Sequence, residues 1–177
     1  CILLVCGCLN GTSSSTFSRE GGQFWMSKII PVSPREQVAA KYIHSYIIAL
    51  LGIIAGSVVL IVGLHLKPGP CAVAILFALV GAVGMTAVGM IIDLARPLLD
   101  WTNPQKAIKQ NLNVLLATFA DIGVLTALFF GIRLLAKTGA PAGTVLVLLY
   151  AALAALSGLS YAGLVRFAER RYREIEV

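Results

Sequence analysis

Charged residues are scarce in this sequence. They make up 12% of its 177 residues, whereas soluble domains contain about 25%. Hydrophobic residues make up 58%, and the mean hydropathy is +0.89. The charges gather in three clusters separated by apolar runs that are nearly free of them. This distribution excludes an ordinary soluble globular domain and is typical of a helical membrane protein that crosses the bilayer several times.

Motifs for catalysis and for cofactor binding are also missing. The sequence has two histidines, no metal-ligand spacing and no nucleophile paired with a base. It has no GxxxxGK[ST] pattern, which holds the phosphates of ATP in many ATPases. The cysteines lie in or beside apolar runs, a setting that favours buried thiols over disulfides or metal ligands. We therefore expect no catalytic site, metal or cofactor in this chain.

Four stretches are long and apolar enough to cross a membrane. One helical crossing needs about 20 apolar residues, and we expect spans at 43–66, 71–92, 112–135 and 144–165. Because the chain begins with Cys1 inside an apolar run, residues 1–15 read as the end of a further span that starts upstream. The expected fold class is all-α: one polytopic transmembrane helix bundle, with four full spans and one partial N-terminal span.

The basic residues indicate the orientation of these spans, because short cytosolic loops are enriched in Lys and Arg. Eleven of the 14 Lys and Arg residues lie in a loop at 16–42, a loop at 93–111 and a tail at 166–177. Lys67, Arg133 and Lys137 fall on the opposite side. We therefore expect a multi-pass protein of the plasma membrane with both loops and the tail in the cytosol. This bias explains the net charge of +6 without nucleic-acid binding.

The first loop contains two local signals. Ser33-Pro34-Arg35-Glu36 predicts a helix start, in which Ser33 caps the helix and Glu36 completes a capping box. Before it, the segment 23–30 is long enough for about two helical turns and has apolar and charged faces. Such a helix can fill a groove on a partner or lie at the membrane surface, and the composition leaves both open.

The second loop carries Asp93, Arg96, Asp100 and Trp101 around a proline. Asp93 and Arg96 are spaced to pair if the helix continues through both. Asn103-Pro104 is a further cap-and-proline start, and we expect its helix to lead towards the next span. A structural or partner-docking role fits these residues better than catalysis.

Together the two loops resemble those of ABC type-2 permeases, the membrane subunits of bacterial ATP-binding-cassette exporters. The residues that carry the resemblance are Arg19-Glu20-Gly21, Phe24-Trp25, Lys28, Pro31-Val32-Ser33-Pro34 and Lys41 in the first loop, and Asp93-Leu94, Arg96-Pro97, Leu99-Asp100-Trp101, Lys109-Gln110-Asn111 and Asn113 in the second. With the order of the spans, the resemblance covers nearly the whole chain, which would be the C-terminal part of a longer permease.

The resemblance implies a transport subunit that is not itself an enzyme. It implies a short cytosolic coupling helix that sits in a cleft of a separate nucleotide-binding ATPase subunit, where the ATP is bound. A second permease subunit, identical or different, would complete the transporter. The contact candidates in the coupling segment are Arg19, Glu20, Phe24, Trp25 and Lys28. The alternative is a non-transporting membrane scaffold whose loops recruit a cytosolic partner.

Three features inside the spans complete the expectations. Asp121 is the one acid well within a span, where an ionisable group is a functional-site hypothesis by default. The alternative is a structural role, in which Asp121 is neutralised or hydrogen-bonded inside the bundle, with Thr118 and Thr126 nearby. Gly52 and Gly56 form a GxxxG row, which favours close helix packing. A second row of small residues in the last span consists of Ala154, Gly158 and Ala162.

Overall fold

The computed structural model describes residues 2–9 and 11–175, and every secondary-structure element in these ranges is helical. Cys1, Asn10, Glu176 and Val177, which belong to the predicted partial span and tail, lie outside the described residues. The all-α fold class predicted from the sequence is confirmed. The elements in chain order are α1 (Ile2–Cys8), η1 (Ser13–Ser15), η2 (Ser18–Gln23), α2 (Phe24–Ile29), α3 (Pro34–Val58), η3 (Val59–Gly63), α4 (Pro68–Ala95), α5 (Lys106–Lys109), α6 (Leu112–Lys137) and α7 (Ala142–Glu174).

Four helical stretches are long and apolar enough to cross a membrane, which makes the chain a multi-pass membrane protein. They are Pro34–Gly63, Pro68–Ala95, Lys106–Lys137 and Ala142–Tyr172. In α4, 50% of the most apolar window is buried inside the protein, against 17–22% in the other three. Helix α4 is therefore the central helix, and the others offer most of their apolar surface to lipid.

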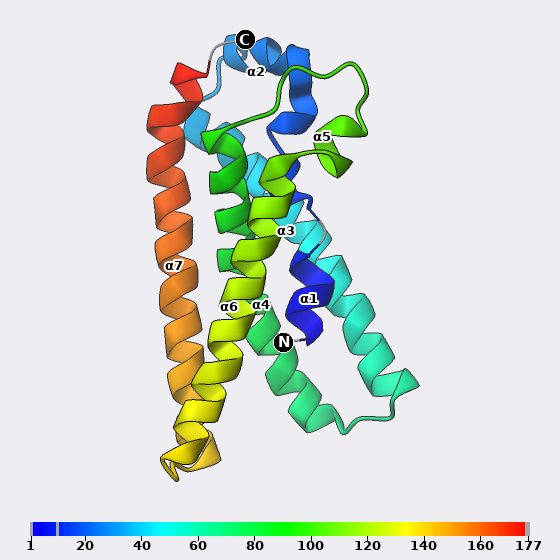
Figure 1. Cartoon of the computed structure of the whole chain (residues 1–177), viewed down its shortest axis with the longest axis vertical. Helices are drawn as coiled ribbons and strands as arrows, with labels where there is room; N and C mark the ends of the chain where they lie inside the picture. The colour runs from blue at the N-terminus through cyan, green and yellow to red at the C-terminus, as the bar shows by residue number, and fades with distance from the viewer. Residues whose placement is uncertain (1, 10, 176–177) are drawn as a thin grey trace.

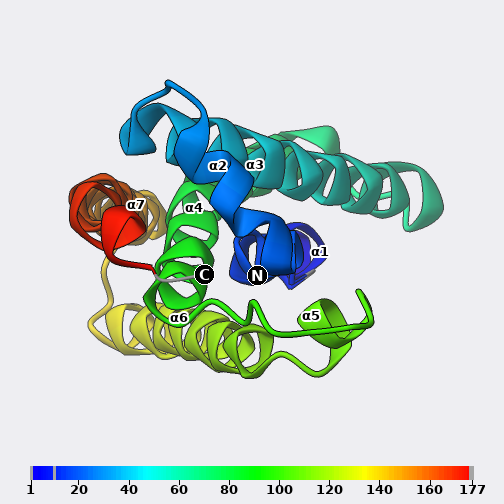
Figure 2. The same ribbon diagram turned by 90° about the horizontal axis from the view of Figure 1, so that it is seen from above.

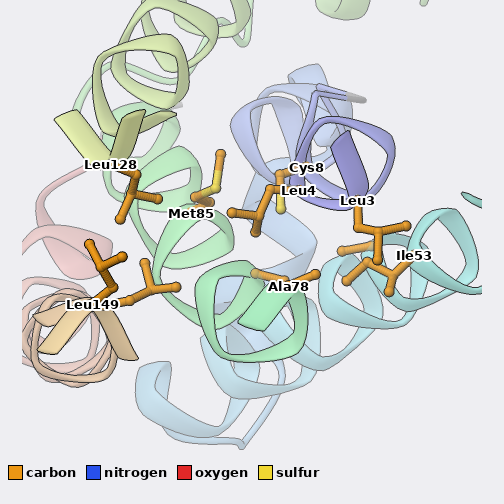
Figure 3. Close-up of a cluster of buried hydrophobic side chains, with 11 residues drawn as sticks. Leu3, Leu4, Cys8, Ile53, Ala78, Met85, Leu128 and Leu149 are labelled. Carbon is orange, nitrogen blue, oxygen red and sulfur yellow. The ribbon is translucent and has the colours of Figure 1, made fainter. Parts of the chain in front are cut away.

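The view along the bundle shows the same arrangement, with α1, α3, α6 and α7 placed around α4 (Figure 2). One group of buried side chains joins all five helices (Figure 3). It includes Leu4 from α1, Ile53 from α3, Met85 from α4, Leu128 from α6 and Leu149 from α7. The short α1 is thus an integral part of the core.

Glycines let α1 and α3 approach closely, as the GxxxG row predicts. A Cβ atom at Gly52 would collide with the backbone carbonyl of Cys6, and one at Gly56 would lie 3.2 Å from the Cys6 sulfur. The small-residue row in α7 behaves differently. A Cβ atom at Gly158 would have nothing within 4 Å, and Ala154 and Ala162 are exposed. This second row packs no helix within the described chain.

Some helix ends differ from the prediction. The capping box is present: the Ser33 hydroxyl accepts from the Glu36 amide at 3.3 Å, and the Glu36 carboxylate accepts from the Ser33 amide at 3.0 Å. However, α1 ends at Cys8 and does not continue to residue 15, because the chain turns at Gly11, whose φ is +67°. The helix expected after Asn103-Pro104 is also interrupted, and α6 begins anew with Asn111 as its cap.

The loops divide between the two ends of the bundle. Helices α2 and α5, the long connection before α5 and the C-terminal end of α7 lie at one end, which we call the loop end (Figure 1). The two short connections, at 64–67 and 138–141, lie at the opposite end (Figure 1). The two loops and the tail that the charge pattern groups together are therefore neighbours in space.

Candidate docking site at the loop end

A buried carboxylate joins the two loops. Asp93 lies near the end of α4 and is fully buried. Its carboxylate accepts hydrogen bonds from the backbone amides of Phe17 at 2.6 Å and Ser18 at 3.1 Å, and from the Ser18 hydroxyl. The side-chain amide of Asn113, at the start of α6, donates a fourth at 3.0 Å. The first backbone amides of η2 have no acceptor within that short helix, and the Asp93 carboxyl supplies one.

Ser18 extends this connection to the rest of the second loop. Its hydroxyl oxygen accepts from the Leu98 amide at 2.9 Å, and its carbonyl accepts from the Trp101 indole at 2.7 Å. The Trp101 ring lies against Gly21, where a Cβ would come within 2.6 Å of it. Gly21 also has a φ of +53°, a conformation that favours glycine. We call Ser18, Asp93, Trp101 and Asn113 the Asp93 hub.

The condition for a pair between Asp93 and Arg96, a helix that continues through both, is not met. Helix α4 ends at Ala95, so Arg96 leaves the helical register and its side chain is exposed. Asp93 instead bonds the first loop, and Asn113 donates to the Arg96 carbonyl at 2.7 Å. Asp100 is exposed at the same end of the bundle.

The charged residues predicted to contact a partner are largely occupied within the chain. Arg19 donates to the carbonyls of Thr12 and Ser15, each at 3.3 Å. Glu20 forms an ion pair with Lys41 and accepts from the Ser27 hydroxyl at 2.8 Å. The Lys28 ammonium donates to the carbonyl of Ile175 beyond the end of α7. The contacts of Glu20 and Lys28 connect α2 with α3 and with the end of α7.

The two aromatic residues of the coupling segment have opposite positions. Phe24 is fully buried, with its ring centre 5.2 Å from that of Tyr172 on α7. Its side chain therefore belongs to the core, and the predicted contact role does not fit this position. Trp25 points outward and is 50% exposed. With it, Met26, Ile29 and Ile30 are 41%, 70% and 49% exposed, and we call these four residues the α2 patch.

The tenth predicted site residue lies elsewhere. Asp121 is in the middle of α6, is buried, and faces a small cavity between α4, α6 and α7. Thr118 was named from the sequence as a nearby partner for Asp121. Its hydroxyl instead donates to the Val114 carbonyl of its own helix at 2.8 Å. Asp121 is therefore not part of the loop end.

Two members of the hub were not predicted as site residues: Ser18 was missed, and Asn113 was recognised only as part of a motif. Both are polar residues next to apolar segments, which is a weak signal for buried hydrogen bonding. Their bonds to Asp93 join residues 75 and 20 positions apart, and no local pattern encodes such a pairing.

The fold and the loop end define a class: a multi-pass helical membrane protein whose polar end is rigidly cross-linked and bears an exposed apolar helix face. Comparisons with known protein families, with curated proteins and with solved structures found no match to this chain. Within residues 2–9 and 11–175, no three His, Cys, Asp or Glu side chains are grouped so that they could hold a metal ion.

Proposed function

We propose that this chain is the permease subunit of an ATP-binding-cassette transporter, acting in export, and that a separate ATPase subunit binds at its loop end. Its two loops resemble those of type-2 permeases. The single observation that carries the proposal is the α2 patch. Large apolar side chains exposed together on a polar end of a protein are typical of an interaction site. The loop end would face the cytosol of the cell, in keeping with its Lys and Arg residues.

The contacts around α2 support a mechanical role. The ion pair of Glu20 with Lys41 links the segment to α3, and the Lys28 bond links it to the end of α7. The Asp93 hub links the preceding η2 to α4 and α6. A force applied to α2 by a partner would therefore reach all four spans. Movements of an ATPase during ATP hydrolysis would change the packing of the spans through these links.

The exposure of the side chains supports a choice of contact residues within this proposal. Trp25 and Ile29 are the most exposed residues of the patch, and Arg19 and Glu20 lie on η2, directly before α2 in the chain. Phe24 is buried and does not contact the partner; it packs on Tyr172 of α7 and so holds α2 in place. ATP stays on the partner subunit, and a second permease subunit completes the transport path.

The proposal is tested by copurification with the ATP-binding-cassette ATPase encoded nearest to this chain. We expect Trp25→Ala to weaken binding more than tenfold, since a central aromatic contact contributes about 2 kcal/mol or more. Ile29→Ala should weaken binding as well, because Ile29 is 70% exposed in the same patch. Ile108→Ala is the matched control, because Ile108 is an exposed apolar residue of α5 at the same end, 43% exposed. Binding would be measured by titration of the ATPase onto the chain in lipid nanodiscs.

Two results contradict parts of the proposal. Equal binding by the parent, Trp25→Ala and Ile29→Ala chains would exclude the α2 patch as the docking surface. Patch-dependent binding that leaves ATP turnover of the partner unchanged would instead support the alternative, a scaffold that recruits a partner without driving transport.

A further inference from the structure

An apolar groove runs between α6 and α7. Its volume is about 450 Å³, which is within the usual range for sites that bind small molecules. Ala127 and Gly131 of α6 and Ala152 of α7 line it, and larger side chains such as Leu135 and Leu156 border it. Because the small residues come from both helices, α6 and α7 leave a space here that their own side chains do not fill.

The length of this groove matches one leaflet of a bilayer. Val124 and Leu135, eleven positions apart on α6, both line it. With a rise of about 1.5 Å per residue they are about 16 Å apart along the helix, and the hydrocarbon core of a bilayer is about 30 Å thick. Helix α6 ends at Lys137, at the end of the bundle opposite the loop end (Figure 1). The groove therefore extends from that end towards the middle of the membrane.

A second hollow on α6, beside the groove, carries positive charge. Its volume is about 510 Å³, and its lining includes Arg133, Lys137 and the exposed rings of Phe129 and Phe130. The Arg133 guanidinium lies over the Phe129 ring, 5.8 Å from its centre. Gly131 lines both this hollow and the groove, so the two meet at a residue that has no side chain to separate them.

These two cations have no acid of the chain beside them. Residues 122–168, which include both walls of the groove and the connection between them, contain no Asp or Glu. Residues 37–92, which include the other connection at this end, contain none either. The negative charge that balances Arg133 and Lys137 therefore comes from outside these segments. Guanidinium and ammonium groups both bind phosphate, the guanidinium with two parallel hydrogen bonds.

We propose that α6 and α7 bind a phospholipid with an anionic headgroup, in the leaflet at the end opposite the loop end. The phosphate lies between Arg133 and Lys137, which are one helical turn apart and can reach the same group. One acyl chain passes Gly131 and lies in the apolar groove. Any phospholipid can supply the acyl chain, but an anionic headgroup also balances both cations, so the site prefers anionic lipids. This inference does not rest on the proposed transport function.

The headgroup is tested by native mass spectrometry of the full chain in detergent, titrated with phosphatidylglycerol or phosphatidylcholine. We expect the parent chain to bind phosphatidylglycerol about tenfold more tightly. Arg133→Gln and Lys137→Gln should each weaken that binding about fivefold, the usual contribution of one basic residue near a lipid surface. Lys67→Gln is the matched control, because Lys67 is exposed at the same end but lies between α3 and α4. Equal binding of both lipids by the parent chain overturns the proposal, and so does an equal effect of Lys137→Gln and Lys67→Gln.

A second set of variants tests the groove with the same titration. Ala152→Phe places a ring where the acyl chain would lie, so binding of phosphatidylglycerol should weaken more than fivefold. Ala154→Phe is the matched control, because Ala154 is also exposed on α7 but lies nearly opposite to Ala152 around the helix and outside the groove. Ala127→Phe fills the groove from α6 and replaces Ala152→Phe if circular dichroism shows that the latter loses its helices. Unchanged binding by the groove variant, or the same loss with Ala154→Phe, overturns the groove as the lipid site.

Discussion

At the scale of single residues, two buried acids on long apolar helices, Asp93 and Asp121, have different surroundings. Asp93 accepts hydrogen bonds from two segments, the start of η2 and the start of α6, whereas Asp121 lines a small cavity. The first arrangement satisfies the carboxyl oxygens with hydrogen bonds and holds the loop end together. Burial alone therefore does not show the role of a carboxyl in this protein. The hydrogen-bond donors around Asp93 show that it joins the two loops.

Replacing Asp93 should disrupt the loop end. Asp93→Ala leaves the amides of Phe17 and Ser18 and the amide of Asn113 without their acceptor, and each buried unpaired group costs about 1–3 kcal/mol. We expect a loss of at least about 3 kcal/mol, measured as a fall in Tm of the purified protein in detergent. Asp100→Ala, an exposed acid of the same loop, should stay within about 0.5 kcal/mol. Similar falls for both would refute the hub.

Residue-level prediction succeeded where the partners are close in sequence. Ser33 and Glu36 are three positions apart, so their capping box is a local pattern that can be predicted from the sequence. The partners of Asp93 and of Lys28 are distant, and Lys28 bonds a residue 147 positions away. The burial of Phe24 was missed for the same reason, because it depends on Tyr172 at the other end of the chain.

At the scale of elements, small residues have two different uses. In α3 they form a groove for α1, since a Cβ at Gly52 would collide with the Cys6 carbonyl. In α7 the row around Gly158 faces outward. The two rows look alike in sequence, because spacing shows which residues share a helix face but not what that face meets. The break between α1 and η1 was not predicted either. The structure shows a positive φ at Gly11 there, and the glycine in the sequence was the available signal.

The matched pair Gly52→Ala and Gly158→Ala separates these uses. Gly52→Ala forces α1 away from α3, and overpacking of this kind costs about 1–3 kcal/mol. Gly158→Ala has free space and replaces a poor helix former by a good one, so stability should be unchanged or slightly higher. Thermal unfolding in detergent would measure both. Equal destabilisation would mean that Gly158 also packs against something, such as a second copy.

At the scale of the whole molecule, hydropathy was the strongest guide. The four long helices follow from apolar length alone, since each crossing needs its backbone bonds satisfied internally. The position of α4 at the centre did not follow, because all four stretches are similarly apolar. Its richness in small residues was a usable signal, as Gly81, Gly84 and Gly89 each pack against another element.

The distribution of Lys and Arg predicts the orientation of the bundle, with the loop end in the cytosol. Thr102 belongs to the connection before α5, which lies at the loop end, and Thr138 to the connection between α6 and α7, which lies at the opposite end; both are exposed. With the loop end in the cytosol, a membrane-impermeant maleimide added to intact cells should label Thr138→Cys and not Thr102→Cys. Permeabilised cells should give labelling of both. The parent chain is the control, because its described cysteines lie in apolar helices and two of them, Cys8 and Cys71, are buried. Labelling of Thr102→Cys in intact cells would reverse the orientation and remove the α2 patch from the reach of a cytosolic ATPase.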